Sequence, residues 1–389
     1  MHPKRPSVLR QARHQRHAEA PVTSTAGRSR RRMTLHSGDA VLVTGAGGFI
    51  GSAIVRALLP LGVEVVATVE PGGREENLKG LDIKVVPVDI RQRDDVFEVM
   101  KGVRAIFHTA AVFRFWARYP HIFYDVNVQG TRNVLDAASA AACERIVYTS
   151  TVATIGLDGT SSGHAAHEGI AARIDHLHGL YKQSKYVAEH EVLRAAAEGA
   201  PVTLVHPTFP LGPRDIRPTP TGKVILDFLN GRMPAYVDTA VNVVHVDDLA
   251  QGHLLALERG RNGRSYILGG ENLSMRDLLM TLASRTGLPA PTRQIPRALG
   301  VAAGVVSDLV EGRLLRREPR VPLEAARMST THMIFDSSRA TAELGFEPRP
   351  AFEAIEDSAR WFVENGYVTP QRASRIRWPI ARDEDSGSV

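Results

Sequence analysis

Between Ala40 and His206, short runs of apolar residues alternate with longer stretches whose apolar residues recur every three or four positions. The short runs predict β-strands at Ala40–Thr44, Val63–Val69, Ile83–Val88, Ala105–Thr109, Arg145–Ser150 and Val202–His206. The longer stretches predict helices at about Phe49–Leu59, Asp94–Met100, Ile122–Ala142 and Tyr181–Glu198. Nearly continuous apolar strands separated by helices are typical of a parallel sheet covered on both faces, so the pattern predicts a doubly wound α/β fold.

The strict alternation ends near Pro207, where proline and glycine become frequent and mixed helices and short strands follow. We expect a smaller mixed α/β lobe over residues 208–368 that binds the substrate, with one return toward the main sheet near residues 241–257. The main sheet would occupy residues 39–207. Residues 1–38 lack periodicity and predict a disordered basic extension, and residues 369–389 predict a flexible polar tail.

Charge is unevenly distributed along the chain of 389 residues, whose 43% hydrophobic and 23% charged residues are otherwise typical of a soluble globular protein. Residues 1–33 hold nine Lys or Arg and one acid, whereas the rest holds 39 basic and 41 acidic residues. The folded part is therefore near neutral, and no nucleic-acid partner is expected. The basic extension leaves open a peripheral contact with an anionic membrane.

Cysteine and histidine usage narrows the class of protein further. The single cysteine, Cys143, excludes a disulfide framework and suits a reducing cytoplasm, where we expect the protein. Histidines cluster at His164/His167 and His176/His178 without a third ordered ligand, so we expect no metal site. The apolar run from Ala298 ends at Ser307, short of the roughly 18 residues that span a membrane.

A glycine-rich turn directly follows the first predicted strand and opens the first predicted helix, with Gly45, Gly48 and Gly51 at regular spacing. Such glycines form a tight turn, admit a pyrophosphate to the backbone and let the helix pack close to its strand. The first helical residues, Phe49 and Ile50, would present their amides to the anion. The motif predicts a dinucleotide site in a Rossmann-type fold.

Residues at the ends of the next strands would complete this cofactor site. Glu70 lies 19 residues beyond Gly51, where a carboxylate binds the adenosine ribose of NAD and repels a 2′-phosphate. The other candidates are Asp89 with Ile90 for the adenine, the small pair Ala110 and Ala111 for the ribose, and Pro207. Simple turn chemistry and packing remain the alternative for Glu70, Asp89 and the two alanines.

A catalytic set is predicted from three residues. Tyr181 and Lys185 are four positions apart at the start of a predicted helix, so their side chains lie on one face. A neighbouring ammonium favours the phenolate form of a tyrosine, which is otherwise a poor base at neutral pH. Thr151 follows the fifth strand, where its hydroxyl would hydrogen-bond the reacting oxygen. We expect Tyr181 to move a proton while NAD carries the hydride.

At this point the chain resembles a known family, the extended short-chain dehydrogenases/reductases. The resemblance rests on the glycine motif, Thr151, Tyr181-x-x-x-Lys185 and Val244-His245-Val246-Asp247-Asp248. Longer motifs, Phe115–Arg118, Asn127–Asn133, Gly212–Gly222 and Gly231–Thr239, resemble more narrowly the hopanoid-associated sugar epimerases, relatives of dihydroflavonol 4-reductases. The likeness covers about residues 39–368 and implies an oxidoreductase or epimerase.

Three departures from related patterns refine that expectation. Many flavonol-type reductases have Arg where Glu70 stands, so the change favours NAD over NADP. Sugar-nucleotide epimerases commonly have Arg shortly before the His-Val segment, whereas this chain has Val241–Val244, which argues against a nucleotide-sugar substrate. Dehydratases follow the active-site hydroxyl with Asp-Glu, but Val152 and Ala153 follow Thr151, which disfavours dehydration.

Candidate substrate residues follow the fourth strand and the crossover into the second lobe: Arg114, Trp116, Thr208, Arg214 and Tyr236. For Arg114 and Trp116 surface packing is the alternative, and for Arg214 it is a salt bridge within the loop. The segment Ala298–Leu315 predicts a helix of the second lobe, with a position on a membrane surface as the alternative.

The expected function is an NAD-dependent oxidoreductase or epimerase acting on a hydroxyl or ketone of a sugar or sugar-like polyol, free or lipid-linked, in hopanoid biosynthesis. The alternatives are a ketone reductase like dihydroflavonol 4-reductase or 3β-hydroxysteroid dehydrogenase, and a cofactor-binding regulator without turnover. The retained Thr151, Tyr181 and Lys185 argue against the regulator. The sequence leaves self-association into a homodimer open.

Overall fold

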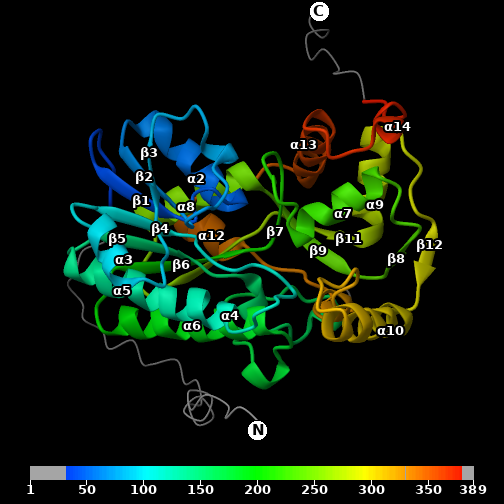
Figure 1. Cartoon of the computed structure of the whole chain (residues 1–389), viewed down its shortest axis with the longest axis horizontal. Helices are drawn as coiled ribbons and strands as arrows, with labels where there is room; N and C mark the ends of the chain where they lie inside the picture. The colour runs from blue at the N-terminus through cyan, green and yellow to red at the C-terminus, as the bar shows by residue number, and fades with distance from the viewer. Residues whose placement is uncertain (1–31, 329, 379–389) are drawn as a thin grey trace, which may run out of the picture. The chain divides into compact units, whose positions relative to one another are not determined.

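The computed structural model describes residues 32–328 and 330–378 (Figure 1). Its strands are β1 Ala40–Thr44, β2 Glu64–Val69, β3 Lys84–Pro87, β4 Ala105–His108, β5 Arg145–Thr149, β6 Val202–Pro207, β7 Phe209–Leu211, β8 Ala235–Val237, β9 Ala240–His245, β10 Ser265–Leu268, β11 Glu271–Ser274 and β12 Arg293–Ile295. Its α-helices are α2 Phe49–Leu58, α3 Arg93–Val99, α4 Ile122–Tyr124, α5 Thr131–Ala140, α6 Leu180–Ala197, α7 Pro220–Leu229, α8 Val246–Arg259, α9 Met275–Thr286, α10 Arg297–Ser307, α11 Leu323–Met328, α12 Ser338–Leu344, α13 Ala351–Glu364 and α14 Pro370–Ala373.

The main sheet has seven parallel strands in the order β10-β6-β5-β4-β1-β2-β3. Chain order reverses between β1 and β4, which creates the crevice where ligands of open α/β sheets bind. The predicted doubly wound fold is confirmed. The long predicted helix at Ile122–Ala142 is interrupted by one π-helical segment, Asp125–Gly130, between α4 and α5.

Helices cover both faces of this sheet because successive strand residues point to opposite sides. On β1, Val41 and Val43 join a core with α2, α8 and α12, whereas Leu42 joins a second core with α3, α5 and α6. All three side chains are fully buried. Continuous apolar strands are therefore what this double-sided packing requires.

The remaining elements form a second lobe, which we define as β7–β9, β11, β12, α7, α9–α11, α13 and α14. Its core lies between α7, α9 and α13, around Leu229, Leu282 and Phe362. Strand β9 of the expected return segment pairs with β7 and β11 instead of the main sheet. The next helix, α8, packs against α2, and the strand that joins the main sheet is β10. The boundary at residues 207/208 stays a prediction.

Both ends of the described chain are more ordered than the sequence indicates. The expected extension 1–38 differs from residue 33 onward, because Met33 is buried and its amide donates to the Glu258 carbonyl, 3.1 Å away. The expected tail 369–389 differs over residues 369–378, where Ile376 is buried and the Arg377 amide donates to the Thr286 carbonyl. Residues 1–31 and 379–389 lie outside the described residues.

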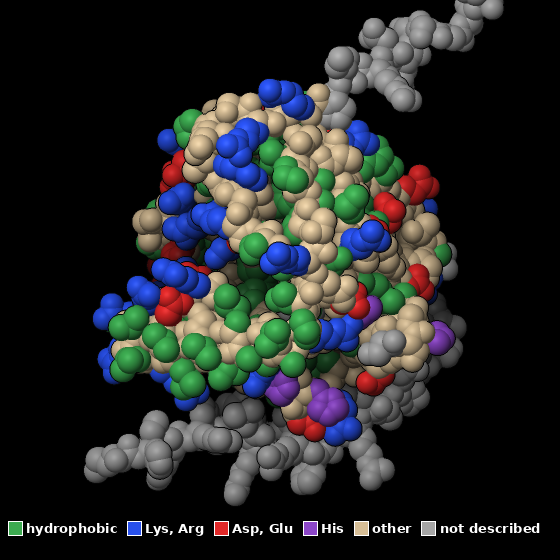
Figure 2. All heavy atoms as spheres, turned by 90° about the vertical axis from the view of Figure 1, so that its right-hand side faces the viewer, with side chains coloured by type: hydrophobic (Ala, Val, Ile, Leu, Met, Phe, Trp, Pro, Cys, Tyr) green, Lys and Arg blue, Asp and Glu red, His purple; other side chains and the backbone are tan. Residues whose placement is uncertain are grey.

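The predicted helix at Ala298–Leu315 forms α10 and a π-helical segment, Asp308–Leu314, and packs on α11. Its outer face is apolar: Leu299, Val306, Leu309 and Leu314 are each at least half exposed. Figure 2 shows hydrophobic side chains gathered low on this side of the molecule, with Lys and Arg side chains around them. Within residues 32–328 and 330–378, no helix combines the length and apolar character needed to cross a membrane.

Candidate active site

The glycine turn is shaped for close approach. Gly45 has a φ of +67°, and a Cβ built on it would lie 2.7 Å from Ala110 Cα. A Cβ on Gly51 would lie 2.4 Å from the Gly45 carbonyl oxygen. Since either side chain would collide with backbone, glycine at these two positions lets β1, α2 and the loop after β4 meet.

Helix α2 begins in a way that suits an anion. Its N-cap, Gly48, provides no side-chain hydrogen bond, and its first turn contains no acid. The first amides of a helix have no partner within the helix and carry its positive dipole end. The turn and the start of α2, with Phe49 and Ile50, therefore fit a pyrophosphate.

Buried hydrogen bonds of His108 connect the strand that precedes this turn to its neighbours. His108 on β4 bridges Thr44 Oγ1, 2.7 Å from its Nδ1, and Thr131 Oγ1, 3.0 Å from its Nε2. Burial, and less strongly the charge of Lys185, lower the pKa of His108 to about 3. The imidazole is thus neutral and links β1, β4 and α5 without adding a charge beneath the dinucleotide site.

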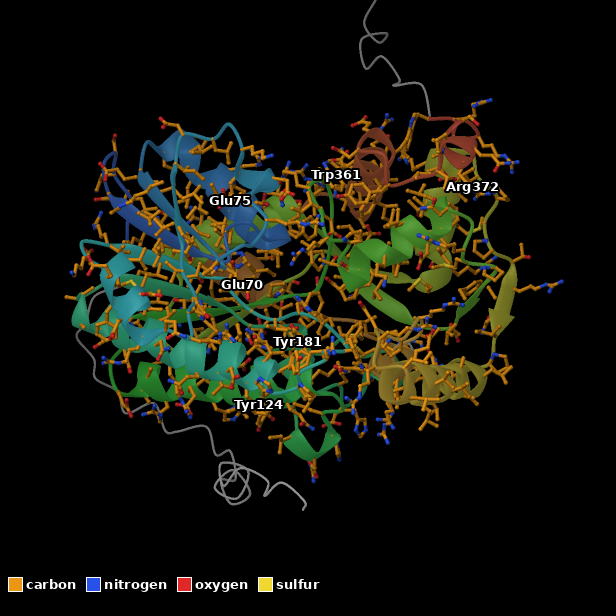
Figure 3. The ribbon with its side chains drawn as sticks, viewed as in Figure 1. Glu70, Glu75, Tyr124, Tyr181, Trp361 and Arg372 are labelled. Atoms are coloured by element: carbon orange, nitrogen blue, oxygen red, sulfur yellow. The ribbon has the colours of Figure 1, made fainter. Side chains whose placement is uncertain are left out.

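The remaining cofactor candidates stand around the ends of β2, β3, β4 and β6. Glu70 is exposed just beyond β2 and, in Figure 3, lies toward the middle of the view as Tyr181 does. Asp89 is half-buried and paired with Arg91, whose guanidinium lowers the pKa of the carboxyl. Ile90 and Pro207 are buried, Ala110 is half-buried and Ala111 is exposed. Their contacts with a cofactor remain predictions.

Tyr181 lies in the first turn of α6, 7% exposed, with the Phe113 ring 4.9 Å from its own. Burial raises the pKa of the Tyr181 phenol well above its usual value, while a hydrogen bond with the Thr151 hydroxyl lowers it. Thr151 directly follows Ser150 beyond β5 and caps a short turn, its Oγ1 accepting from the Ala153 amide. The structure therefore brings together two of the three predicted catalytic side chains.

Lys185 lies one turn further along α6 and is also buried. Its Nζ donates to the Tyr148 hydroxyl and the Thr149 carbonyl oxygen, both 2.8 Å away. Burial lowers the pKa of Lys185 to about 7, and the charge of Glu189 opposes that shift. The ammonium is thus tied to the end of β5, beside the residues that lead to Thr151.

A further polar network fixes the start of α6. Asn127, in the π-helical segment, donates to Ser184 Oγ at 2.9 Å and accepts from the Val112 amide at 2.7 Å. Ser184 in turn donates to the Tyr181 carbonyl oxygen, 2.8 Å away. π-Helical turns are frequent at functional sites. Here the π-helical segment places Asn127 where it contacts Val112 and Ser184.

Comparisons with known proteins agree with this geometry. The model of the family described as "NAD dependent epimerase/dehydratase family" matches residues 41–269. The chain is 43% identical over 337 residues to the "Putative dihydroflavonol 4-reductase" of Synechocystis sp., covering 86% of this chain and 97% of that protein. The chain belongs to the NAD dependent epimerase/dehydratase family.

The chain is also similar to a second curated protein and to a solved structure. It is 34% identical over 330 residues to "Sterol demethylase protein B" of Methylococcus capsulatus, covering 84% of this chain and 99% of that protein. The crystal structure of a nucleoside-diphosphate-sugar epimerase from Pseudomonas aeruginosa matches with a TM-score of 0.71 and 26% identity, over 85% of this chain and 99% of that one. The predicted family is confirmed, and the protein is an oxidoreductase that binds a nicotinamide dinucleotide.

The predicted substrate residues of this protein do not gather at one site. Trp116 lines a cavity of about 420 Å³ between the loop after β4 and α11, whereas Arg114 is exposed. Arg214, with a φ of +75°, forms an ion pair with Asp247 in the first turn of α8, outside its own loop. Tyr236 packs against the core of the second lobe.

Thr208 keeps a buried hydroxyl without a hydrogen-bond partner among the described residues. This orphaned group directly follows Pro207 at the end of β6.

Three residues near the candidate site were not predicted from the sequence. Tyr148 reads as an apolar strand residue, although its hydroxyl accepts from Lys185. Glu189 accepts hydrogen bonds from Ser150 and Thr154, and its position four residues after Lys185 on one helix face was the available signal. Glu324 is 143 positions from Tyr181, so only the tertiary fold relates them.

Proposed function

We propose that this enzyme interconverts a secondary alcohol and a ketone on a sugar or sugar-like polyol, free or lipid-linked, with NAD as its cofactor. The observation that carries the proposal is the position of Tyr181. It is buried against Phe113 of the loop after β4, the Thr151 hydroxyl lowers its pKa, and Lys185 is one helical turn away. The narrow motifs support hopanoid lipid biosynthesis as the context, with epimerisation as one outcome of the same chemistry.

The reaction divides between the protein and its cofactor. The bound nicotinamide dinucleotide supplies or accepts the hydride. Tyr181 takes the proton of the substrate hydroxyl during oxidation and returns it during reduction, and Thr151 hydrogen-bonds the same oxygen. Lys185 stabilises the phenolate electrostatically and, when the cofactor is bound, would contact its ribose. The hydroxyl of Tyr148 and the carbonyl of Thr149 keep this ammonium in place.

A plain ketone reductase is the second candidate. Two observations favour it: the printed names of the relatives include several reductases, and the cavity beside Trp116 also has Phe115, Phe123 and Leu323 in its lining. Such an enzyme would release a reduced alcohol and oxidised cofactor, whereas an epimerase would return the hydride to the same carbon on the opposite face.

The deciding experiment incubates the pure enzyme with candidate sugars and polyols plus NAD, and with candidate ketones plus NADH. Absorbance of NADH and the stereochemistry of the products are measured together. Inverted product without net NADH indicates epimerisation, and stoichiometric NADH indicates net oxidation. Turnover of ketones with no turnover of any polyol would replace the proposal by the second candidate.

The preference for NAD rests on the Glu70 carboxylate, which would repel the 2′-phosphate of NADP. Titration of NADH and NADPH by fluorescence should show at least about tenfold tighter binding of NADH, the effect of about 1.4 kcal/mol. Glu70→Gln should narrow that ratio, and Glu75→Gln, an exposed acid beyond β2, serves as the control. Tighter binding of NADPH to the unmodified enzyme would remove this part of the proposal.

A further inference from the structure

A buried carboxylate of the second lobe lies next to the catalytic helix. Glu324 on α11 is 8% exposed, and its Oε1 is buried with no hydrogen-bond partner among the described residues. A Cβ built on Gly179, two residues before Tyr181, would lie only 1.8 Å from Glu324 Oε2. The carboxylate therefore rests directly on the backbone that leads into α6.

Lys182, the residue after Tyr181, is a cation whose charge acts on this acid. Burial lowers the pKa of Lys182, and the charge of Glu324 raises it. Burial raises the pKa of Glu324 to about 7, with the Lys182 charge acting in the opposite direction. The two groups nevertheless form no ion pair in the described part of the chain, so each retains capacity for another partner.

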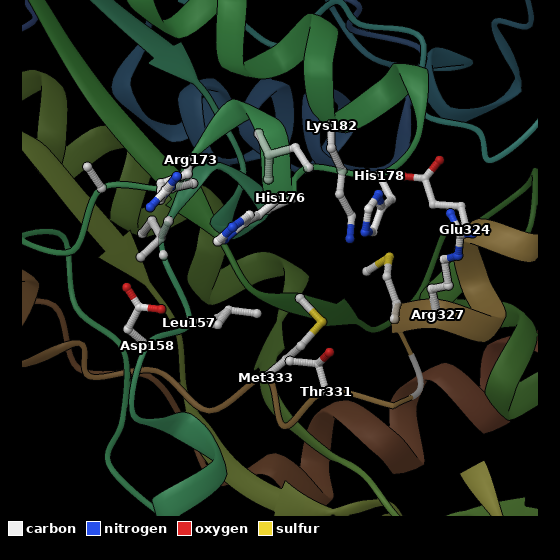
Figure 4. A pocket seen from close by; sticks show the side chains of 17 residues that line it. Leu157, Asp158, Arg173, His176, His178, Lys182, Glu324, Arg327, Thr331 and Met333 are labelled. Carbon is white, nitrogen blue, oxygen red and sulfur yellow. The ribbon is translucent and has the colours of Figure 1, made fainter. Parts of the chain in front are cut away.

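Both side chains border the same cavity. It measures about 240 Å³ and includes Ala153 and Ile155, which follow Thr151, together with His178 and Arg327. In Figure 4, Lys182 and His178 reach into it from the side of α6, and Glu324 and Arg327 approach from α11. Glu324 also lines the neighbouring cavity that contains Trp116. Tyr181 itself lines neither cavity. Glu324 is related to it through Gly179, two residues earlier in the chain, and through its charge, which raises the pKa of Tyr181.

We propose that Glu324 and Lys182 form a subsite for a substrate hydroxyl on the carbon next to the one that reacts at Tyr181. The hydroxyl would donate to Glu324 Oε1 and accept from the Lys182 ammonium, which satisfies the orphaned oxygen. This inference rests on the proposed function and specifies its substrate as an α-hydroxy ketone or a vicinal diol. A buried acceptor left unpaired without ligand also rejects substrates that lack the hydroxyl.

The first experiment compares two probes that differ by one hydroxyl, 2-hydroxycyclohexanone and cyclohexanone, reduced with NADH. The unmodified enzyme should favour the hydroxylated probe in kcat/KM by about 10- to 100-fold, the range for a hydrogen bond to a charged group. Glu324→Met and Lys182→Met should bring that ratio close to one, mainly through KM. Glu324→Gln, which keeps an acceptor oxygen, should retain part of the preference.

The control is Glu318→Met, which removes an exposed acid of the same lobe that lines neither cavity. An unchanged ratio in Glu324→Met, or equal losses on both probes, would overturn the subsite. Reduction of cyclohexanone alone would overturn it while the second candidate function stands.

A second measurement needs no turnover, so it separates the subsite from the proposed function. A buried, unpaired carboxylate destabilises the ligand-free fold, and functional groups commonly carry such a cost. At pH 8, Glu324→Met should therefore raise the Tm of the ligand-free enzyme by about 1–4 °C, while Glu318→Met leaves it unchanged. A lower Tm would show that Glu324 holds the lobes together and would overturn the subsite. If the unmodified enzyme reduces neither probe, the Tm shift alone decides for Glu324, and the proposed function is decided by the assays with sugars and polyols.

Discussion

Tyr181 offers the most direct test of the proposed chemistry. Burial and the charge of Glu324 raise the pKa of its phenol, and the Thr151 hydroxyl lowers it. We therefore expect Thr151 to favour proton release during the reaction. Tyr181→Phe keeps the ring and its packing on Phe113 but removes the proton. Turnover should fall by roughly 10²–10⁴, the contribution of a general acid or base, while NADH affinity changes little.

Stopped-flow or steady-state rates and fluorescence titration of NADH measure the two quantities separately. Tyr186→Phe, on the same helix and half-buried, is the matched control because its hydroxyl lies outside the catalytic set. Wild-type turnover in Tyr181→Phe on an identified substrate would refute the catalytic assignment.

Lys185 gives the ligand-free protein a pH-dependent stability. Its pKa is about 7 when folded, because of burial, against about 10.5 in an unfolded chain. The cost of burying the ammonium is fully present below pH 7 and disappears as pH rises toward 10.5, since the unfolded chain binds more protons within that window. The free energy of unfolding of Lys185→Met minus that of the wild type should therefore be larger at pH 6 than at pH 9, by about 2 kcal/mol.

Urea unfolding at the two pH values measures this difference. Lys223 is exposed to water, so Lys223→Met provides the baseline for the change in unfolding free energy. A difference that does not change with pH would mean that Lys185 stays charged in the folded protein at both values.

At the scale of single elements, the junction of β1, α2 and the loop after β4 depends on a glycine without room for a methyl group. Gly45 and Gly102 have nearly the same backbone, with φ of +67° and +75°, but a Cβ on Gly102 would meet nothing within 4 Å. Gly102→Ala should cost about 1 kcal/mol for the left-handed backbone alone. Gly45→Ala should cost a further 1–3 kcal/mol, roughly, for the collision with Ala110.

Chemical denaturation of the two variants gives the difference, and NADH titration reports on the anion site. We expect Gly45→Ala to lose cofactor affinity and Gly102→Ala to keep it. Equal destabilisation with unchanged affinity in both would show that the turn relaxes without disturbing α2.

At the scale of the whole molecule, the compact unit begins at Met33, whose side chain is buried and whose amide is bound to Glu258. Residues 1–32 carry nine basic residues and one acid. Deleting them should leave Tm, NADH affinity and turnover unchanged. Co-sedimentation of the full chain with anionic vesicles at low and high salt tests whether this segment binds membranes, with about 1 kcal/mol for each basic residue near the surface.

Salt-sensitive vesicle binding that disappears on deletion would identify the segment as an electrostatic anchor. Binding that persists would direct attention to the exposed apolar face of α10. A lower Tm after deletion would contradict the expectation that the segment is separate from the folded unit.

The sequence by itself predicted the doubly wound fold with six of the strands of the main sheet and the glycine turn, and it indicated Thr151, Tyr181 and Lys185 as catalytic candidates. These features are local: strand and helix periods, backbone that requires glycine, and spacings within one helix or one turn. Even the ends of the predicted strands agree with the structure to within about one residue.

Tertiary structure alone decided the contacts between distant segments. It joined β10 to the sheet in place of β9, packed Ile376 and Met33 into cores, and tied Arg214 to Asp247. It also brought Glu324 against Gly179, two residues before Tyr181. A periodic pattern shows that a face will be buried without showing which partner buries it, so only the tertiary structure could show that α11 of the second lobe contacts the start of α6.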